Sequence, residues 1–85
     1  MGLMQLGRAR LALSLPRHRK QLRDARDHRL YGLFEEYARA SSTLADLQRE
    51  LPRREALIAN YQQTCLDLQA DVLVLLGKLN EPLFY

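Results

Sequence analysis

Residues 53–79, RREALIANYQQTCLDLQADVLVLLGKL, decide the fold of this 85-residue chain. Apolar residues recur here at alternating spacings of three and four, the heptad period of a helix that packs against other helices. This first stripe consists of Ile58, Tyr61, Cys65, Leu68, Val72, Leu75 and Leu79. Pro52 suits the first turn of a helix, and the stretch from Asn80 to Pro82 ends it. We therefore predict one long helix over residues 53–79.

A second stripe with the same period precedes Pro52. It consists of Leu30, Leu33, Tyr37, Ala40, Leu44, Leu47 and Leu51. The period predicts another amphipathic helix, roughly over residues 18–50, in which Thr43 and Asp46 have the spacing of a cap that restarts the helix. Pro52 favours a turn, so that the two stripes face each other in an antiparallel hairpin. A mere kink there would leave both stripes to pack against other chains.

The predicted fold class is all-α, with two long amphipathic helices forming an antiparallel hairpin or coiled coil. We expect a basic N-terminal arm over residues 1–16 and a single helical domain over residues 17–85. The conformation of the arm stays open, because Leu11, Leu13 and Leu15 alternate like a strand whereas Leu3, Leu6 and Leu13 fit one helix face. Pro16 ends either element.

The stretch from Arg10 to Leu15, followed by Pro16 and basic residues, resembles the opening of ribbon-helix-helix DNA-binding proteins. The resemblance implies a strand that inserts into a DNA groove. The rest of the sequence departs from that family, which has two short helices after the strand where this chain has two long stripes.

Positive charge is concentrated in the first third of the chain. The net charge is +3, but residues 1–30 carry eight Lys or Arg against Asp24 and Asp27, whereas residues 31–85 carry five against eight acids. Seven of the eight are Arg, which suits bidentate contact with phosphate or carboxylate. We expect an anionic partner, whether nucleic acid, acidic protein or membrane surface. The candidate contacts are Arg8, Arg10, Arg17, Arg19, Lys20 and Arg23.

Catalysis is poorly supported by the sequence. Cys65 occupies a stripe position, where a thiol packs as a small apolar group. His18 and His28 lie ten residues apart among arginines, which suits neither a metal site nor a positioned general base. No glycine-rich phosphate loop is present. We therefore expect no enzyme activity, no catalytic residue, no bound metal and no cofactor.

The sequence indicates the cellular compartment only in general terms. A single cysteine excludes an internal disulfide and favours a reducing, intracellular compartment. The first 23 residues are basic without an acid, as in an organellar presequence, so a mitochondrial location fits as well. The apolar run from Val72 to Leu76 is far shorter than the roughly 20 residues of a transmembrane helix.

The function predicted from the sequence is protein interaction. A hairpin buries one stripe from each helix, which leaves a surplus apolar face of Leu66, Leu73 and Leu76. Such a face is typical of an interaction site. We expect a non-catalytic helical structural subunit or adaptor in a larger assembly or homo-oligomer. The alternative is a small basic nucleic-acid-binding protein, a ribonucleoprotein subunit or DNA-bound regulator, that contacts phosphates through its N-terminal third.

Overall fold

The computed structural model describes residues 2–79, which are helical except for short connections. The elements are α1 (Leu3–Ser14), the 3₁₀ turn η1 (Pro16–His18), α2 (Arg19–Asp24), α3 (His28–Arg49) and α4 (Glu55–Leu79). The all-α prediction is confirmed for this part of the chain. The predicted helix stop at Asn80 to Pro82 lies outside the described residues.

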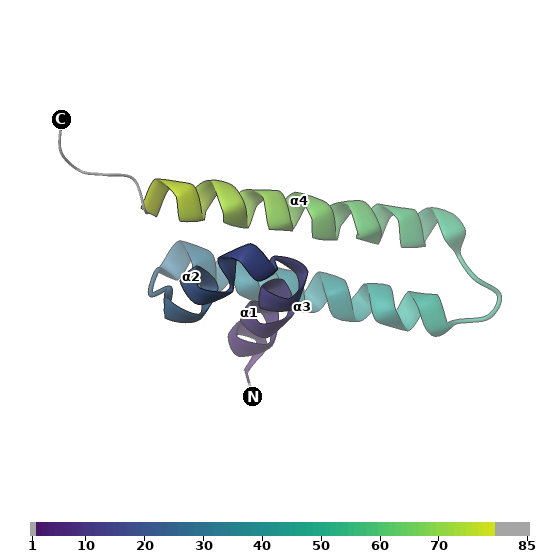
Figure 1. Cartoon of the computed structure of the whole chain (residues 1–85). Coiled ribbons are helices and arrows are strands. Elements are labelled where there is room, and N and C mark those ends of the chain that lie inside the picture. Colours follow the sequence, from purple (N-terminus) through teal and green to yellow (C-terminus); the bar gives the residue numbers. More distant parts are fainter. Residues whose placement is uncertain (1, 80–85) are drawn as a thin grey trace.

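The two longest helices, α3 and α4, pack side by side and run in opposite directions (Figure 1). Residues 50–54 join them, so the chain does turn around Pro52. Helix α1 lies against α3 and α2 packs on α1, and the far end of the hairpin projects as two helices alone (Figure 1). The molecule is consequently elongated, with extents of 56 × 27 × 20 Å.

The first long helix was predicted too long. Its expected start near residue 18 is wrong, because the chain is extended at Ala25 and α3 begins only after Asp27. The Asp27 carboxylate accepts hydrogen bonds from the backbone N–H groups of Arg29 and Leu30, at 2.9 and 3.3 Å. This satisfies two of the free donors at a helix start, which is why α3 begins there.

The predicted restart at Thr43 is wrong as well, because α3 is continuous through residues 41–43. Ser41 donates to the carbonyl oxygen of Ala38 one turn earlier, at 3.3 Å. Its hydroxyl and that of Ser42 also accept hydrogen bonds from Arg10 of α1, at 2.8 and 2.7 Å. These weak helix formers therefore serve a tertiary contact instead of breaking the helix.

The N-terminal segment is a packed helix and not a separate arm. Its Leu, Met, Ala and Arg residues favour a helix, and Pro16 ends it. The resemblance to a ribbon-helix-helix protein fails here, since residues 10–14 belong to α1 and residues 2–79 contain no strand. Leu11 is completely buried, whereas Leu13 is 77% exposed on the other side of the helix.

Helix α1 crosses α3 at Gly7. A Cβ atom placed there would lie only 1.7 Å from the carbonyl oxygen of Phe34, so the two backbones touch. This close crossing seats Leu11 and Leu22 in one core with residues of the hairpin. The hairpin contributes Leu30, Phe34, Tyr37, Ala40, Cys65, Leu68, Val72 and Leu76 to this core.

Candidate functional site

The two predicted apolar stripes are only partly used by the core. The buried members are Leu30, Tyr37, Ala40, Leu47, Ile58, Cys65, Leu68 and Val72. The half-buried members are Leu33, Leu44, Tyr61 and Leu75. Leu51 lies in the turn and is 89% exposed, and Leu79 is 42% exposed. The half-buried members mark the apolar surface that the hairpin leaves uncovered.

Three of the four half-buried stripe residues line one groove between α3 and α4, which we call the hairpin groove. It comprises two pockets, of about 270 and 400 Å³, that are each lined by residues of both helices. On α3 it is lined by Arg29, Leu33, Glu36, Arg39, Ala40 and Thr43, and on α4 by Tyr61, Thr64, Leu68, Asp71, Val74, Leu75 and Lys78.

The hairpin groove has the spacing of a helix-packing surface. The α3 residues 29, 33, 36, 40 and 43, and the α4 residues 61, 64, 68, 71, 75 and 78, each recur at alternating intervals of three and four. This is the seam that a further helix uses in a bundle. The contacts with α1 come from another side of α3, through Phe34, Ala38, Ser41 and Ser42. Helix α1 therefore does not cover this seam.

Charges of both signs border the hairpin groove. Arg29 is paired with Asp27, at 3.3 Å between nitrogen and oxygen. The remaining four charged residues, Glu36, Arg39, Asp71 and Lys78, form no ion pair within residues 2–79. Two are acidic and two are basic, so the border is electrically balanced.

The residues predicted as a surplus apolar face do not form one face. Leu66 is 56% exposed and Leu73 is half-buried, but Leu76 is 3% exposed and belongs to the core. Leu76 belongs to the same core cluster as Leu11 of α1 and Leu22 of α2. The sequence did not predict that these two helices add residues to the core of the hairpin. Val74, at 59% exposed, is the most exposed large apolar residue of α4 and borders the hairpin groove.

Of the six predicted anion contacts, Arg10 is half-buried and bonds to α3. Its Nη1 donates to the backbone oxygen of Ala38 at 3.2 Å, and to the Ser41 and Ser42 hydroxyls. These bonds fasten α1 to α3. Arg10 is therefore engaged in the fold in this structure.

Arg8 is also partly built into the fold. Its Nη2 donates to the backbone oxygen of Ala25 at 2.9 Å, and its guanidinium carbon lies 5.7 and 5.4 Å from the ring centres of Tyr31 and Phe34. Both distances suit a cation–π contact. The buried Nε of Arg8 has no hydrogen-bond partner within the described chain, so the guanidinium keeps unfilled donor capacity.

Three predicted contacts, Arg8, Arg19 and Arg23, come together around a pocket between α1 and α2. This arginine pocket has a volume of about 250 Å³, and its other lining residues are Gln5, Ala9 and Ala12. No acidic residue lines it. The remaining contacts lie apart from it: Arg17 is exposed on η1, and Lys20 borders a different pocket beside Leu76 and Leu79.

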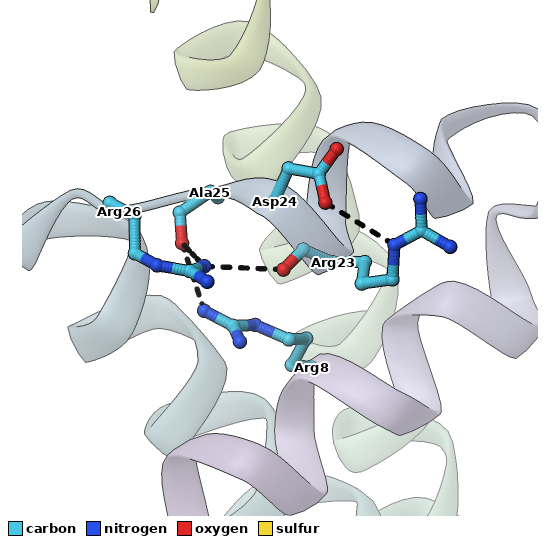
Figure 2. Close-up of polar contacts among 5 residues, drawn as sticks. All are labelled: Arg8, Arg23, Asp24, Ala25 and Arg26. Atoms are coloured by element: carbon cyan, nitrogen blue, oxygen red, sulfur yellow. Dashed lines mark hydrogen bonds and ion pairs between the residues drawn. The ribbon is translucent and has the colours of Figure 1, made fainter.

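The connection between α2 and α3 adds a further cation beside the arginine pocket. Figure 2 shows the Arg8 and Arg26 guanidinium groups converging on the backbone oxygen of Ala25, each at 2.9 Å. Their donating nitrogens therefore lie less than twice that distance apart. Neither arginine has an ion-pair partner within residues 2–79.

The two acids of the N-terminal third already have partners. Asp24 pairs with Arg23 at 3.2 Å, and both side chains are exposed (Figure 2). The hydrogen bond from the Arg29 side chain, with those from the backbone at the start of α3, lowers the pKa of Asp27 below its ordinary value of 3.8. Such acids do little to neutralise Arg8, Arg19 and Arg26.

No arrangement within residues 2–79 indicates catalysis. Cys65 is a buried free thiol, and burial raises its pKa above the ordinary value of 9.0, which disfavours the reactive thiolate. No group of three His, Cys, Asp or Glu residues in the described part is placed to hold a metal ion. Among the described helices, none is both long and apolar enough to cross a membrane.

No family model matches the chain, and neither a curated protein nor a solved structure is significantly similar to it.

The sequence did not single out Gly7, which is buried where α1 touches α3, or Arg26 in the connection before α3. The only sign of the close helix crossing in the sequence was a glycine in a segment without a heptad stripe. Arg26 could have been found from Asp27, because a helix cap there places the preceding residues in an exposed connection.

Proposed function

We propose that this protein is a non-catalytic helical structural subunit or adaptor that binds another chain through the hairpin groove. The observation that carries the proposal is the pair of heptad seams on α3 and α4, whose apolar members Leu33, Tyr61 and Leu75 stay half-buried after the core is complete. An apolar seam bordered by polar residues is typical of a helix-packing interface.

The partner we propose for the groove is a second copy of the chain. In a two-fold symmetric interface the same surface patch faces its own copy. A patch with one dominant charge repels itself, but the unpaired border of the groove carries two acids and two bases. Those charges, Glu36, Arg39, Asp71 and Lys78, can pair across the interface without a net electrostatic cost. A partner with a large net charge of either sign would find no opposite net charge on this border.

The size of the groove sets the expected affinity. From Tyr61 to Lys78 the seam is about 26 Å long, and two helices side by side are about 20 Å wide, so the footprint is about 500 Å² per copy. A standard stable interface buries about 800 Å² per partner. We therefore expect a weak dimer, with a dissociation constant on the order of micromolar.

The test compares two matched variants on α4. Val74 borders the hairpin groove and Leu66 does not, yet their exposed fractions are 59 and 56%. A two-fold dimer contains Val74 twice, so Val74→Glu buries two carboxylates in the interface. Each burial costs about 2 kcal/mol of binding free energy, and the two together weaken dimerisation by roughly 1,000-fold. Leu66→Glu adds the same charge outside the groove and should leave the dimer intact.

Light scattering over a range of protein concentrations measures the molar mass of the wild type and of both variants. The proposal expects a concentration-dependent dimer for the wild type and Leu66→Glu, and a monomer for Val74→Glu. It is contradicted by a wild type that stays monomeric up to millimolar concentration. It is equally contradicted if Leu66→Glu dissociates the dimer and Val74→Glu does not, which would assign the interface to the surplus face around Leu66 and Leu73.

Nucleic-acid binding remains the second candidate, and the exposed cations of the N-terminal third support it. Arg17, Arg19 and Lys20 are exposed and form no ion pair within the described chain. Contacts to phosphates would make the affinity for RNA or DNA fall steeply with added salt, whereas association through the apolar groove would hardly respond. A salt titration of nucleic-acid binding and of dimer mass separates the two functions.

A further inference from the structure

We propose that the two copies meet with each helix packed antiparallel on its own counterpart, α3 on α3 and α4 on α4. The inference rests on the proposed function, because it requires a second copy in the hairpin groove. In this arrangement Glu36 of each copy faces Arg39 of the other. These two residues then determine how the copies are oriented.

Two orientations of a two-fold axis lay one hairpin groove flat on the other. An axis parallel to the helices places α3 of one copy on α4 of the second copy, at the same level along the hairpin. An axis across the helices places α3 on α3 and α4 on α4, with their directions reversed. In both cases the same patch faces itself and neighbouring helices are antiparallel. The charges that line the groove must therefore distinguish the two orientations.

The pocket linings show which residues lie at the same level along the hairpin. One pocket joins the α3 residues 36–43 to the α4 residues 61–68, and the other joins the α3 residues 29–33 to the α4 residues 71–78. Because α3 and α4 run in opposite directions, residue numbers rise along one helix as they fall along the other. The level of every lining residue in a second copy follows from this correspondence.

An axis parallel to the helices brings like charges together. Arg29 and Lys78 line the same pocket, and Glu36 and Asp71 lie within one helical turn of a common level. This axis keeps every level, so it sets Glu36 against Asp71 of the second copy and Arg29 against Lys78. Facing like charges disfavours an interface.

An axis across the helices brings opposite charges together on α3. When it passes midway between residues 36 and 39, Glu36 of each copy lies opposite Arg39 of the other, and symmetry makes the pair occur twice. Both side chains are exposed, both line the groove, and neither forms an ion pair within residues 2–79. The interface supplies the partner that each lacks.

The same axis also matches the apolar residues of α4. By the pocket linings, the level midway between residues 36 and 39 falls near Leu68. Tyr61 and Leu75 lie seven residues to either side of Leu68, so reversing the helix packs Tyr61 on Leu75 of the second copy. Both are half-buried in the single chain and gain cover together. One axis therefore satisfies α3 and α4 at once.

The substitution Glu36→Arg gives opposite results in the two orientations. With the antiparallel pairing it sets an arginine against Arg39 of the other copy twice, and we expect dimerisation to weaken by roughly 10-fold to 30-fold. With the axis parallel to the helices the new arginine faces Asp71, and dimerisation should strengthen. Light scattering over a range of protein concentrations measures the dissociation constant.

Charge exchange provides the second measurement. Arg39→Glu should weaken dimerisation as Glu36→Arg does, and the double variant should return to within about threefold of the wild type because both ion pairs are restored with their charges exchanged. A mixture of the two single variants should form mixed dimers about tenfold more tightly than either variant alone. Native mass spectrometry with one variant isotope-labelled separates mixed from like dimers. Arg17→Glu makes the same charge change on η1 and should alter dimerisation by less than about twofold.

The outcomes separate this inference from the proposed function. A wild type that stays monomeric contradicts both. A dimer that Val74→Glu dissociates and Glu36→Arg strengthens keeps the hairpin groove but overturns the antiparallel pairing. So does a dimer that Val74→Glu dissociates while the charge variants and their mixture bind like the wild type. Weakening in each single variant with recovery in the double variant and the mixed dimer supports the pairing, and the recovery also shows that the single variants are folded.

Discussion

Replacing Gly7 by alanine should separate α1 from α3 and destabilise the protein. A Cβ atom at this position would lie 1.7 Å from the carbonyl oxygen and 2.5 Å from the carbonyl carbon of Phe34. Both atoms belong to the backbone of a continuous helix and cannot turn aside. The helices would have to move apart by roughly 1.5 Å at the crossing to restore an ordinary contact distance.

The expected loss of stability follows from the contacts that α1 makes with α3. Overpacking a helix contact typically costs about 1 to 3 kcal/mol. The bonds from Arg10 to Ala38, Ser41 and Ser42 would stretch as α1 moves, at about 1 kcal/mol for each lost bond. Alanine is a better helix former than glycine by about 1 kcal/mol. The net expectation is a loss of about 2 to 4 kcal/mol, or a fall of roughly 10 to 25 °C in Tm.

Gly32 and Gly77 provide the controls, because a Cβ atom at either position meets nothing within 4 Å. In these exposed helical positions alanine should stabilise the protein by about 0.5 to 1 kcal/mol. Urea and thermal unfolding followed by circular dichroism measure all three variants. If Gly7→Ala were as stable as Gly32→Ala, the close crossing would be wrong and α1 would be the free arm expected from the sequence.

Other contacts give further predictions. Arg10→Gln should destabilise the protein by about 2 kcal/mol in urea unfolding, since its Nη1 joins α1 to three acceptors of α3. Asp27→Ala should lower Tm at neutral pH, and the deficit should narrow below pH 3.8. The native pKa of Asp27 is lowered, chiefly by Arg29, so its stabilisation is present above the ordinary pKa and is lost as the wild-type carboxylate becomes protonated. The Cys65 thiol, whose pKa burial raises, should react with Ellman's reagent orders of magnitude more slowly in the native than in the unfolded chain.

Matched variants control these experiments. Arg17→Gln removes an exposed arginine of η1 that forms no ion pair in the described chain, and it should change the free energy of unfolding by less than about 0.5 kcal/mol. Asp46→Ala removes an exposed acid of α3 and should not show the pH-dependent deficit of Asp27→Ala. Rapid labelling of native Cys65 would contradict its burial.

The sequence pattern alone was enough for α4 and for most of α3. In both helices a heptad stripe runs without interruption, and such a period has few structural alternatives. The pattern could not place the start of α3, because the cap at Asp27 stands inside a charged segment whose composition suits a helix. It also could not show that α1 packs on α3, since Gly7 matters only through its contact with Phe34.

The basic residues show why a binding site cannot be assigned from composition alone. Arg8, Arg10, Arg19 and Arg23 look equivalent in the sequence, yet Arg10 bonds to α3 while the other three line a pocket. Arg10 differs from the others because hydrogen-bond acceptors of α3, such as the Ser41 hydroxyl, lie beside it in the folded chain. The sequence around Arg10 does not show that these acceptors will be near. The stripe residues were predicted as interaction positions, but that Leu33, Tyr61 and Leu75 line one groove follows only from the pairing of α3 with α4.

The central claim is that the hairpin groove receives a second copy of the chain, and isotope-filtered NMR on a mixed sample tests it most directly. In a dimer of one ¹³C-labelled and one unlabelled copy, such spectra detect only contacts between the two chains. We expect intermolecular contacts for the methyl groups of Leu33, Val74 and Leu75. Intermolecular contacts confined to Leu66 and Leu73, or none at concentrations where the chain is expected to be a dimer, would contradict it.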